Sequence, residues 1–259
     1  MRTKVIEVVS TNQIMEIEEI AARAWPAKHT QQLGGWLLRS TDGVTHRANS
    51  VLPLHDPPKG DTKKALEMVQ EFYDKHQLPV QFQMTKASQP TNLDEELQSY
   101  GLEIEMHVIV QTANLNDVLT NETEVGVVIM GEPWEDWYRA YCEYAEFEPT
   151  RFRVRRGIIS RISSEKACAA AIKDDKIIGV GMGVLDGHWL GLFSLVTQEK
   201  YRRQRVATSI TRSLVSWAQG QGAKKAYLQV SEPNKSAQQL YYNLGFKDAY
   251  TYWYRLAQE

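Results

Sequence analysis

The sequence is poor in cysteine and has no long apolar run. Two cysteines, Cys142 and Cys168, occur in 259 residues. They are too few for a disulfide framework or for a zinc site built on cysteines, so we interpret both as small buried hydrophobic residues. No stretch approaches the roughly 18 consecutive apolar residues of a membrane-spanning helix, and the N-terminus lacks the pattern of a signal peptide. These absences predict a cytoplasmic protein.

The sequence also lacks an excess of positive charge. Its net charge is −2, which argues against a nucleic-acid-binding protein whose affinity rests on a positive field over the whole domain. The histidines show no metal-ligand spacing, so no metal is expected; those considered are His29, His46, His55, His76 and His107. What remains is an ordinary globular composition, long enough for one large or two small domains.

The most informative stretch is a strand, a loop and a helix over residues 189–220. An apolar run without alternation, 189–196, is typical of a strand buried on both faces. A polar and basic loop follows over 197–205, and apolar residues then recur at three- and four-residue steps from Val206, which predicts a helix. Because N–H groups and the positive end of the helix converge there, the loop predicts a phosphate site.

This loop resembles the coenzyme-A signature of the GNAT superfamily of N-acetyltransferases, Q/R-x-x-G-x-G/A. Here it reads Arg202-Arg203-Gln204-Arg205-Val206-Ala207, with Arg205 where the family prefers glycine. A second signature of the family, N-x-x-A-x-x-L-Y-x-x-x-G-F, is matched at every fixed position from Asn234 to Phe246. Both signatures occur in the family's order, separated by the helix and by an expected strand over 226–230.

The resemblance implies an α/β (α+β) fold with a mixed, mainly antiparallel, twisted sheet flanked by helices, in which two strands splay apart at the cofactor. It also implies acetyl-coenzyme A as cosubstrate, and a main-chain N–H that polarises the thioester carbonyl and stabilises the oxyanion. The residues that it assigns to cofactor binding are Leu195, Val196, Arg202, Arg203, Gln204, Arg205, Val206, Ala207, Thr208 and Asn234.

Tyr241 takes the place of the family tyrosine that protonates the leaving thiolate. A phenol with a pKa near 10 suits a thiolate whose own pKa lies between about 8 and 10. Three alternatives stay open: Tyr241 as a packing residue, Asn234 as a helix N-cap rather than a pantetheine contact, and Arg205 as an obstacle rather than a phosphate partner.

The general base is missing from the central strand, which holds no carboxylate between residues 190 and 196. The nearest candidates are Asp186, His188 and Glu148, each against the alternative of an exposed turn residue. The aromatic and acidic stretch 132–148 occupies the family's acceptor position and suits a cationic amine. Its alternative, which we favour, is an amphipathic helix that packs its aromatic side chains into the core.

The N-terminal half repeats the order of the C-terminal half. Elements expected at 62–76, 80–84, 93–100 and 104–111 mirror those at 206–220, 226–230, 237–243 and 249–256, which indicates a diverged tandem repeat. The N-terminal counterpart of the phosphate loop, 54–60, carries an aspartate and two prolines, so it suits pyrophosphate poorly. We therefore expect a degenerate GNAT-like domain over 1–112, a linker over 113–124 and a catalytic domain over 125–259.

Near the N-terminus, a helix over 12–24 capped by Thr11 or Asn12 is expected, followed by strands over 35–39 and 44–49 with a hairpin turn at residues 41–43.

These expectations together predict an acetyl-coenzyme-A-dependent N-acetyltransferase that acts on a primary amine by direct attack. A non-catalytic acyl-coenzyme-A-binding regulatory protein is one alternative, and a protein or peptide N-acetyltransferase is another. The expected partners are a small-molecule or peptide amine and, as an open alternative, a second copy of the chain, with no nucleic acid and no membrane.

Overall fold

The computed structural model describes residues 9–58, 61–118 and 125–257. The chain divides into two compact units, the first made of Met1–Val110 with Ala249–Glu259 and the second of Gln111–Asp248. The sequence assigned the last strand to the second domain, whereas the structure places it in the first unit. Of the expected linker, residues 113–114 end a strand and Leu115–Asp117 form the short 3-10 helix η3, and residues 119–124 lie outside the described part.

In its described residues, the first unit contains strands of two sheets and three α-helices. Strand β1 (His29–Leu33) pairs antiparallel with β2 (Trp36–Ser40), which pairs with β3 (Leu52–Pro53). In the other sheet, β4 (Gln81–Met84), β11 (Lys247–Ala257) and β5 (Leu102–Asn114) lie in the order β4-β11-β5. The helices are α1 (Thr11–Ala24), α2 (Thr62–Lys75) and α3 (Leu93–Ser99), and Trp36 and Phe82 meet edge to face in the apolar core.

The expected N-terminal hairpin is wrong in its position. The turn lies at Gly34–Gly35, between β1 and β2, and residues 46–48 form the 3-10 helix η1 (His46–Ala48) instead of a strand. Asn49 explains the difference, because its side-chain oxygen accepts from the N–H groups of Thr41 and Gly43 and its amide donates to two carbonyls of the same loop. A side chain that satisfies the loop backbone removes the need for a strand partner. The cap of α1 is Ser10, whose hydroxyl accepts from the Gln13 N–H at 3.3 Å.

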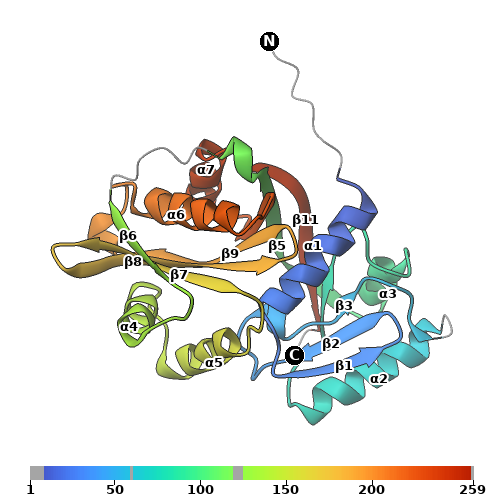
Figure 1. The fold of residues 1–259 in the computed structure, drawn as a ribbon. Helices are drawn as coiled ribbons and strands as arrows, with labels where there is room; N and C mark the ends of the chain where they lie inside the picture. Colours follow the sequence, from blue (N-terminus) through green and yellow to red (C-terminus); the bar gives the residue numbers. More distant parts are fainter. Residues whose placement is uncertain (1–8, 59–60, 119–124, 258–259) are drawn as a thin grey trace. The chain divides into compact units, whose positions relative to one another are not determined.

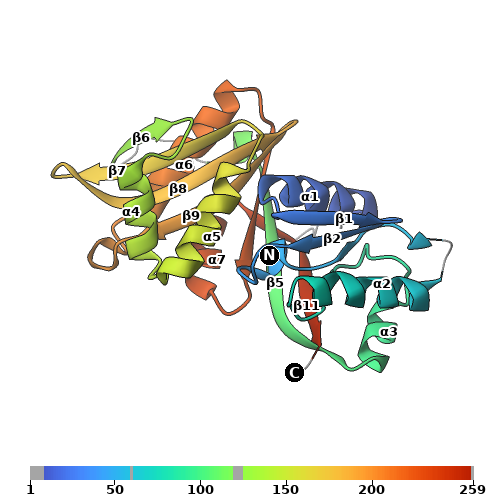
Figure 2. The same ribbon diagram turned by 90° about the horizontal axis from the view of Figure 1, so that it is seen from below.

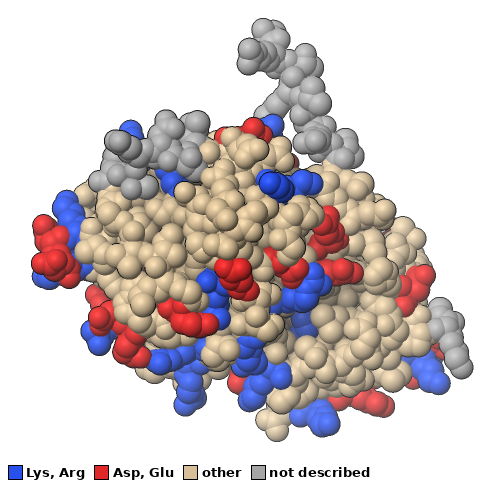
Figure 3. All heavy atoms as spheres, in the orientation of Figure 1, with Lys and Arg blue, Asp and Glu red and all other residues tan. Residues whose placement is uncertain are grey.

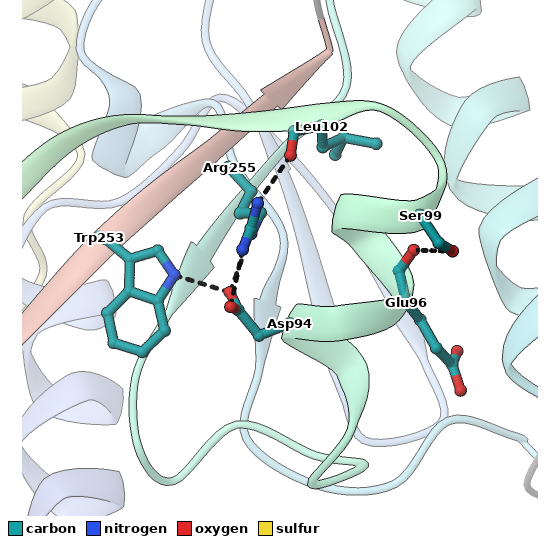
Figure 4. Close-up of polar contacts among 6 residues, drawn as sticks. All are labelled: Asp94, Glu96, Ser99, Leu102, Trp253 and Arg255. Carbon is teal, nitrogen blue, oxygen red and sulfur yellow. Dashed lines mark hydrogen bonds and ion pairs between the residues drawn. The ribbon is translucent and has the colours of Figure 1, made fainter.

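The chain's last strand is fixed in the first unit by one buried arginine (Figure 4). Strand β11 pairs with β4 so that Tyr254 lies opposite Gln83. The Arg255 guanidinium donates to both carboxylate oxygens of Asp94 on α3, at 2.9 and 2.8 Å, and to the Leu102 carbonyl at 2.9 Å. Trp253 donates to the same carboxylate at 2.7 Å. These contacts select the first unit as the place of β11.

Five strands of the second unit follow one another in their sheet in the order β10-β9-β8-β7-β6. Neighbours from β6 to β9 pair antiparallel, and β10 pairs parallel with β9. Helix α6 covers one face of this sheet, and α4 and α5 cover the other (Figures 1 and 2). The elements are β6 (Gly126–Met130), α4 (Glu135–Tyr144), α5 (Pro149–Ser160), β7 (Lys166–Lys173), β8 (Lys176–Asp186), β9 (Trp189–Thr197), η4 (Glu199–Tyr201), α6 (Val206–Gly220), β10 (Lys225–Ser231) and α7 (Lys235–Asn243).

Helix α4 packs its aromatic stripe inward, as the favoured alternative expected. Trp137, Tyr138 and Tyr141 are buried, and the Trp137 indole donates to the Ala169 carbonyl of β7 at 3.0 Å. Two of the acidic residues on its outer side pair with arginines, Glu135 with Arg156 and Asp136 with Arg139. None of the helices in the described ranges is long and apolar enough to cross a membrane.

The order of elements follows the repeat that the sequence predicts. Strand β4, helix α3 and strand β5 in the first unit correspond to β10, α7 and β11 along the second half of the chain. Each helix is followed by a glycine with positive φ, Gly101 in the first copy and Gly245 in the second. A positive φ is tolerated by glycine at little cost, so the two turns share a backbone requirement as well as a position.

Replacing Asp94 by Asn should destabilise the first unit by about 2–3 kcal/mol, because it leaves the buried Arg255 guanidinium without its carboxylate. The effect is smaller than for a fully buried ion pair, because Asp94 is one-third exposed and solvent screens its charge. The Arg255 hydrogen bond lowers the pKa of Asp94, so this contribution exists above the ordinary aspartate pKa and is lost as the pH falls through the lowered value. Urea unfolding at pH 7 and at pH 3 checks this expectation. Glu95→Gln, on the exposed side of the same helix, is the control, and equal stability of both variants at pH 7 would contradict the role of Asp94.

Candidate functional site

The two central strands of the second unit separate part of the way along their length. Strands β9 and β10 are paired from Trp189–Lys225 to Leu192–Leu228, yet β9 continues to Thr197 and β10 to Ser231. Beyond Leu192 the two strands therefore diverge, and the backbone groups that face each other across the gap are not paired between β9 and β10. Such a gap in a sheet accommodates an extended ligand that hydrogen-bonds to main-chain groups.

A bulge in β9 lies where the strands diverge. Val180 faces Val196 and Met182 faces Phe193, so Ser194 and Leu195 together lie opposite Gly181. Ser194 has a φ of 54°, and its hydroxyl is buried without a hydrogen-bond partner. A bulge leaves one residue outside the ladder and turns its backbone groups away from the neighbouring strand. This geometry makes main-chain donors at residues 194–196 available to a ligand.

Helix α6 packs directly on the backbone of β8, because glycines form the surface beneath it. A methyl group added at Gly179 would lie 2.7 Å from the Val206 side chain, and one added at Gly181 would lie 2.7 Å from Ile210. Side chains at these positions would push the helix away from the sheet. The glycines therefore fix the height of the α6 N-terminus above the end of β9.

The loop before α6 adopts the conformation of an anion-binding nest. Arg203 and Arg205 have φ angles of 63° and 57°, in the left-handed region. Arg205 is the N-cap of α6, and no side chain caps the helix. The N–H groups of the first turn therefore keep their hydrogen-bonding capacity. A left-handed residue followed by a right-handed one, as at Arg205 and Val206, directs successive N–H groups toward one point, where they bind anions.

These features surround one cavity of about 790 Å³. It is lined by Tyr144, Leu195, Val196, Thr197, Tyr201, Arg202, Arg203, Arg205, Val206, Ala207, Thr208, Asn234, Lys235, Ser236, Ala237, Gln239, Leu240, Tyr241 and Asn243. Its charged lining residues are Arg202, Arg203, Arg205 and Lys235, and no carboxylate of the described residues is among them. In a chain of net charge −2, this is a local concentration of positive charge suited to a polyanion.

The structure brings together all but one of the residues that the sequence assigned to the site. Gln204 does not line the cavity; its amide donates to the Lys200 carbonyl at 2.9 Å and so supports the loop. Cavity residues that the sequence reasoning missed include Tyr144 from α4 and Lys235 from α7. Tyr144 donates to the Ile177 carbonyl at 2.6 Å. Its only sequence signal was membership of the aromatic stripe, which does not distinguish a cavity wall from the core.

Tyr241 lies on α7 with its ring edge to face against Phe246. It is 7% exposed, and burial raises the pKa of its phenol. The hydroxyl therefore stays protonated throughout the physiological range, as a proton donor must. Tyr241 is therefore both a packing residue and part of the cavity wall.

Asn234 is the N-cap of α7, because its side-chain oxygen accepts from the Ala237 N–H at 3.1 Å and from the Ser236 hydroxyl at 3.0 Å. The capping alternative is therefore realised, and the residue also lines the cavity. The oxygen is used by the cap, so the amide nitrogen is the group left to contact a ligand.

Two of the three candidate bases are at the wrong end of the sheet. Asp186 pairs with Trp189 at the β8–β9 turn, next to His188. This turn is roughly 23 Å from Val196 along an extended strand of seven residues. Glu148 is the exposed N-cap residue of α5 and does not line the cavity. Spacing in the sequence suggested proximity to the site, but the strand carries these groups away from it.

The family model described as "Probable histone acetyltransferase Rv0428c C-terminal" matches residues 11–255. An uncharacterized N-acetyltransferase of Bacillus subtilis, YobR, is 31% identical over 249 residues, which cover 95% of this chain and 99% of the relative. The probable histone acetyltransferase Rv0428c of Mycobacterium tuberculosis is 25% identical over 240 residues, covering 92% of this chain and 72% of that protein.

Two solved structures share the fold at low sequence identity. A GCN5-related N-acetyltransferase from Kribbella flavida superposes with a TM-score of 0.72 at 13% identity, covering 98% of this chain and 97% of the other. A tandem GNAT protein from the clavulanic acid biosynthesis pathway superposes with a TM-score of 0.67 at 13% identity, covering 93% and 87%. At this identity the likeness concerns the fold.

Replacing Gly181 by Ala should destabilise the second unit by about 1–3 kcal/mol, because the new methyl group would lie 2.7 Å from Ile210 and 3.0 Å from Leu195. Gly220→Ala, at the C-terminal end of the same helix with nothing within 4 Å, should stay within about 0.5 kcal/mol of wild type. Urea unfolding of both variants compares them. A Gly181→Ala protein as stable as Gly220→Ala would show that α6 does not depend on this close approach.

Proposed function

Because the chain belongs to the GNAT superfamily of N-acetyltransferases, we propose that its second unit binds acetyl-coenzyme A and that the amine of the acceptor attacks the thioester directly. The family match confirms the resemblance that the two signatures indicated, and N-acetyltransferase activity in general follows from it. The cosubstrate, the acceptor and the roles of individual residues are the content of the proposal.

The main support for this proposal is that an anion-binding nest and a gap between two strands border the same cavity. The nest at Arg203 and Arg205 with the first turn of α6 suits a diphosphate. The gap between β9 and β10 suits an extended pantetheine arm with amide groups. Four cationic side chains line the cavity, which suits the negative charge of a diphosphate.

Each step uses a group that the structure presents to the cavity. Main-chain N–H groups at Leu195 and Val196, beside the bulge, polarise the thioester carbonyl. The Asn234 amide nitrogen contacts the pantetheine arm. Tyr241 donates its proton to the sulfur as the thiolate leaves. Its raised pKa keeps the phenol protonated beforehand, and it also makes the phenol a weaker acid than the match near pKa 10 assumed.

The acceptor amine loses its proton without a lining carboxylate. The species that attacks is therefore the fraction of the acceptor that is already present as the free amine. Its proton then passes to solvent. Turnover should therefore rise with pH in step with deprotonation of the acceptor, without an inflection from an enzyme base near neutral pH.

The decisive experiment is isothermal titration of coenzyme A combined with turnover of acetyl-coenzyme A. The wild type should bind one coenzyme A per chain, and Ala207→Glu should abolish binding, because a carboxylate would stand in the first turn of the helix that faces the phosphates. Ala140→Ser, on α4 and outside the cavity lining, controls for substitution itself. Two sites per chain, or unchanged affinity of Ala207→Glu, would show that the loop is misassigned.

The acceptor class is tested with two panels, small primary amines and lysine-containing peptides. Peptides are included because the matching family model and one relative carry the description of a probable histone acetyltransferase. Acetylation of small amines alone would identify a small-molecule enzyme, and acetylation of peptides alone would identify the protein acetyltransferase alternative.

Tyr241→Phe should lower turnover by about 10²–10⁴-fold where thiolate departure limits the rate, with coenzyme A affinity close to wild type, since only the proton donor is lost. Tyr242→Phe is the matched control: Tyr242 lies outside the cavity lining, with its hydroxyl on Asp248. Steady-state kinetics from pH 6 to 10 compare the three proteins. A Tyr241→Phe enzyme as fast as Tyr242→Phe at every pH would remove Tyr241 from the chemistry.

A further inference from the structure

Two lysines converge on one aromatic ring in the wall of the cavity. The ammonium group of Lys200 lies 4.9 Å from the centre of the Tyr201 ring, and that of Lys173 lies 5.5 Å from it. Lys200 precedes Tyr201 in η4, whereas Lys173 comes from the end of β7. Elements that are distant in sequence thus place two positive charges beside a residue that lines the cavity.

Neither ammonium group is neutralised by a carboxylate of the described residues. The nearest acidic neighbour in the sequence, Glu199, lies 4.0 Å from the Arg202 guanidinium instead. Asp174 and Asp175 form the turn that follows Lys173, and both signs of charge occur together at this hairpin tip (Figure 3). The ring, rather than an ion pair, determines where the two ammonium groups lie.

Two ammonium groups beside one ring, without a carboxylate partner among the described residues, favour a bound anion. The ring quadrupole compensates only a small part of their charge. Lysine suits such a group when the anion is an exposed phosphate monoester, because its ammonium is a mobile point charge with three donors.

We propose that Lys173, Lys200 and Tyr201 form a subsite for the 3′-phosphate of coenzyme A. This inference rests on the proposed function, since it concerns the same cavity. The diphosphate requires the nest at Arg203 and Arg205, which the first turn of α6 completes. The 3′-phosphate is the cosubstrate's remaining strong anion, carrying a charge between −1.5 and −2 at about neutral pH, and the two lysines are a separate group of cations at the Tyr201 side of the lining.

The test compares coenzyme A with dephospho-coenzyme A, which differs from it by the 3′-phosphate alone. By isothermal titration at low salt, the wild type should bind coenzyme A roughly tenfold more tightly, as two exposed phosphate contacts allow. In the double variant Lys173→Ala/Lys200→Ala this preference should fall to about twofold or less. Affinity for dephospho-coenzyme A should stay the same, because these side chains have nothing to bind in it.

Lys225→Ala is the matched control. The Lys225 ammonium also lies over an aromatic ring, 5.1 Å from the centre of Trp189, but at the other end of β9. Its loss removes one positive charge and one cation–π contact without touching the subsite, so the preference for coenzyme A should persist. Thermal unfolding of all variants verifies that they are folded.

The remaining outcomes overturn the inference in distinguishable ways. A double variant that keeps the preference, or a wild type that binds both compounds equally, would show that the lysines do not contact the 3′-phosphate. Equal weakening of both compounds in the double variant would indicate a diffuse field instead of a subsite. A wild type that binds neither compound would refute the proposed function itself.

Discussion

The site depends on how closely α6 approaches the sheet. Gly179 and Gly181 leave no side chain between β8 and the helix, so the first turn of α6 lies at the level of the end of β9. The bulge at Ser194 and Leu195 adjoins the same glycines, since both residues lie opposite Gly181. One short segment of β8 therefore sets the position of the anion nest and of the main-chain donors together. The packing of α6 on this segment therefore determines the geometry of the site.

Arg205 shows how a departure from a signature preserves the geometry that the signature describes. The residue has a φ of 57° and a ψ of 14°, the left-handed conformation in which glycine is favoured. An L-residue with a side chain adopts it at a cost of about 1–2 kcal/mol. The backbone nest thus exists without the glycine, and the exposed side chain adds a positive charge to the cavity lining. The family's preference at this position concerns the backbone more than the absence of a side chain.

Much of the second unit was predictable from its sequence, because its signatures combine local patterns. The strand before the loop, helix α6 and helix α7 follow from apolar runs and periodicity, and residues from both signatures, though not all of them, meet in one cavity. The bulge was not predictable, because Ser194 is a non-glycine residue with positive φ inside an apolar strand. The N-terminal hairpin was misplaced because Gly34–Gly35 and Asp42–Gly43 are both good turn sequences, and the choice between them depends on the Asn49 side chain.

The place of the last strand was the least predictable feature, since it depends on residues distant in sequence. A tandem repeat suggests two halves that are each complete, yet Ala249–Glu259 belongs to the first unit. There Trp253 lies opposite Met84, a pairing between strands that are far apart in the sequence. Without β11, β4 lacks this neighbour and Asp94 lacks the buried arginine that holds its carboxylate. A fragment that ends at residue 110 is therefore missing a strand of its own sheet. The order of elements repeats along the chain, whereas the two compact units are divided differently, because β11 pairs with β4 of the first unit. The first unit therefore depends on a strand from the second half of the sequence.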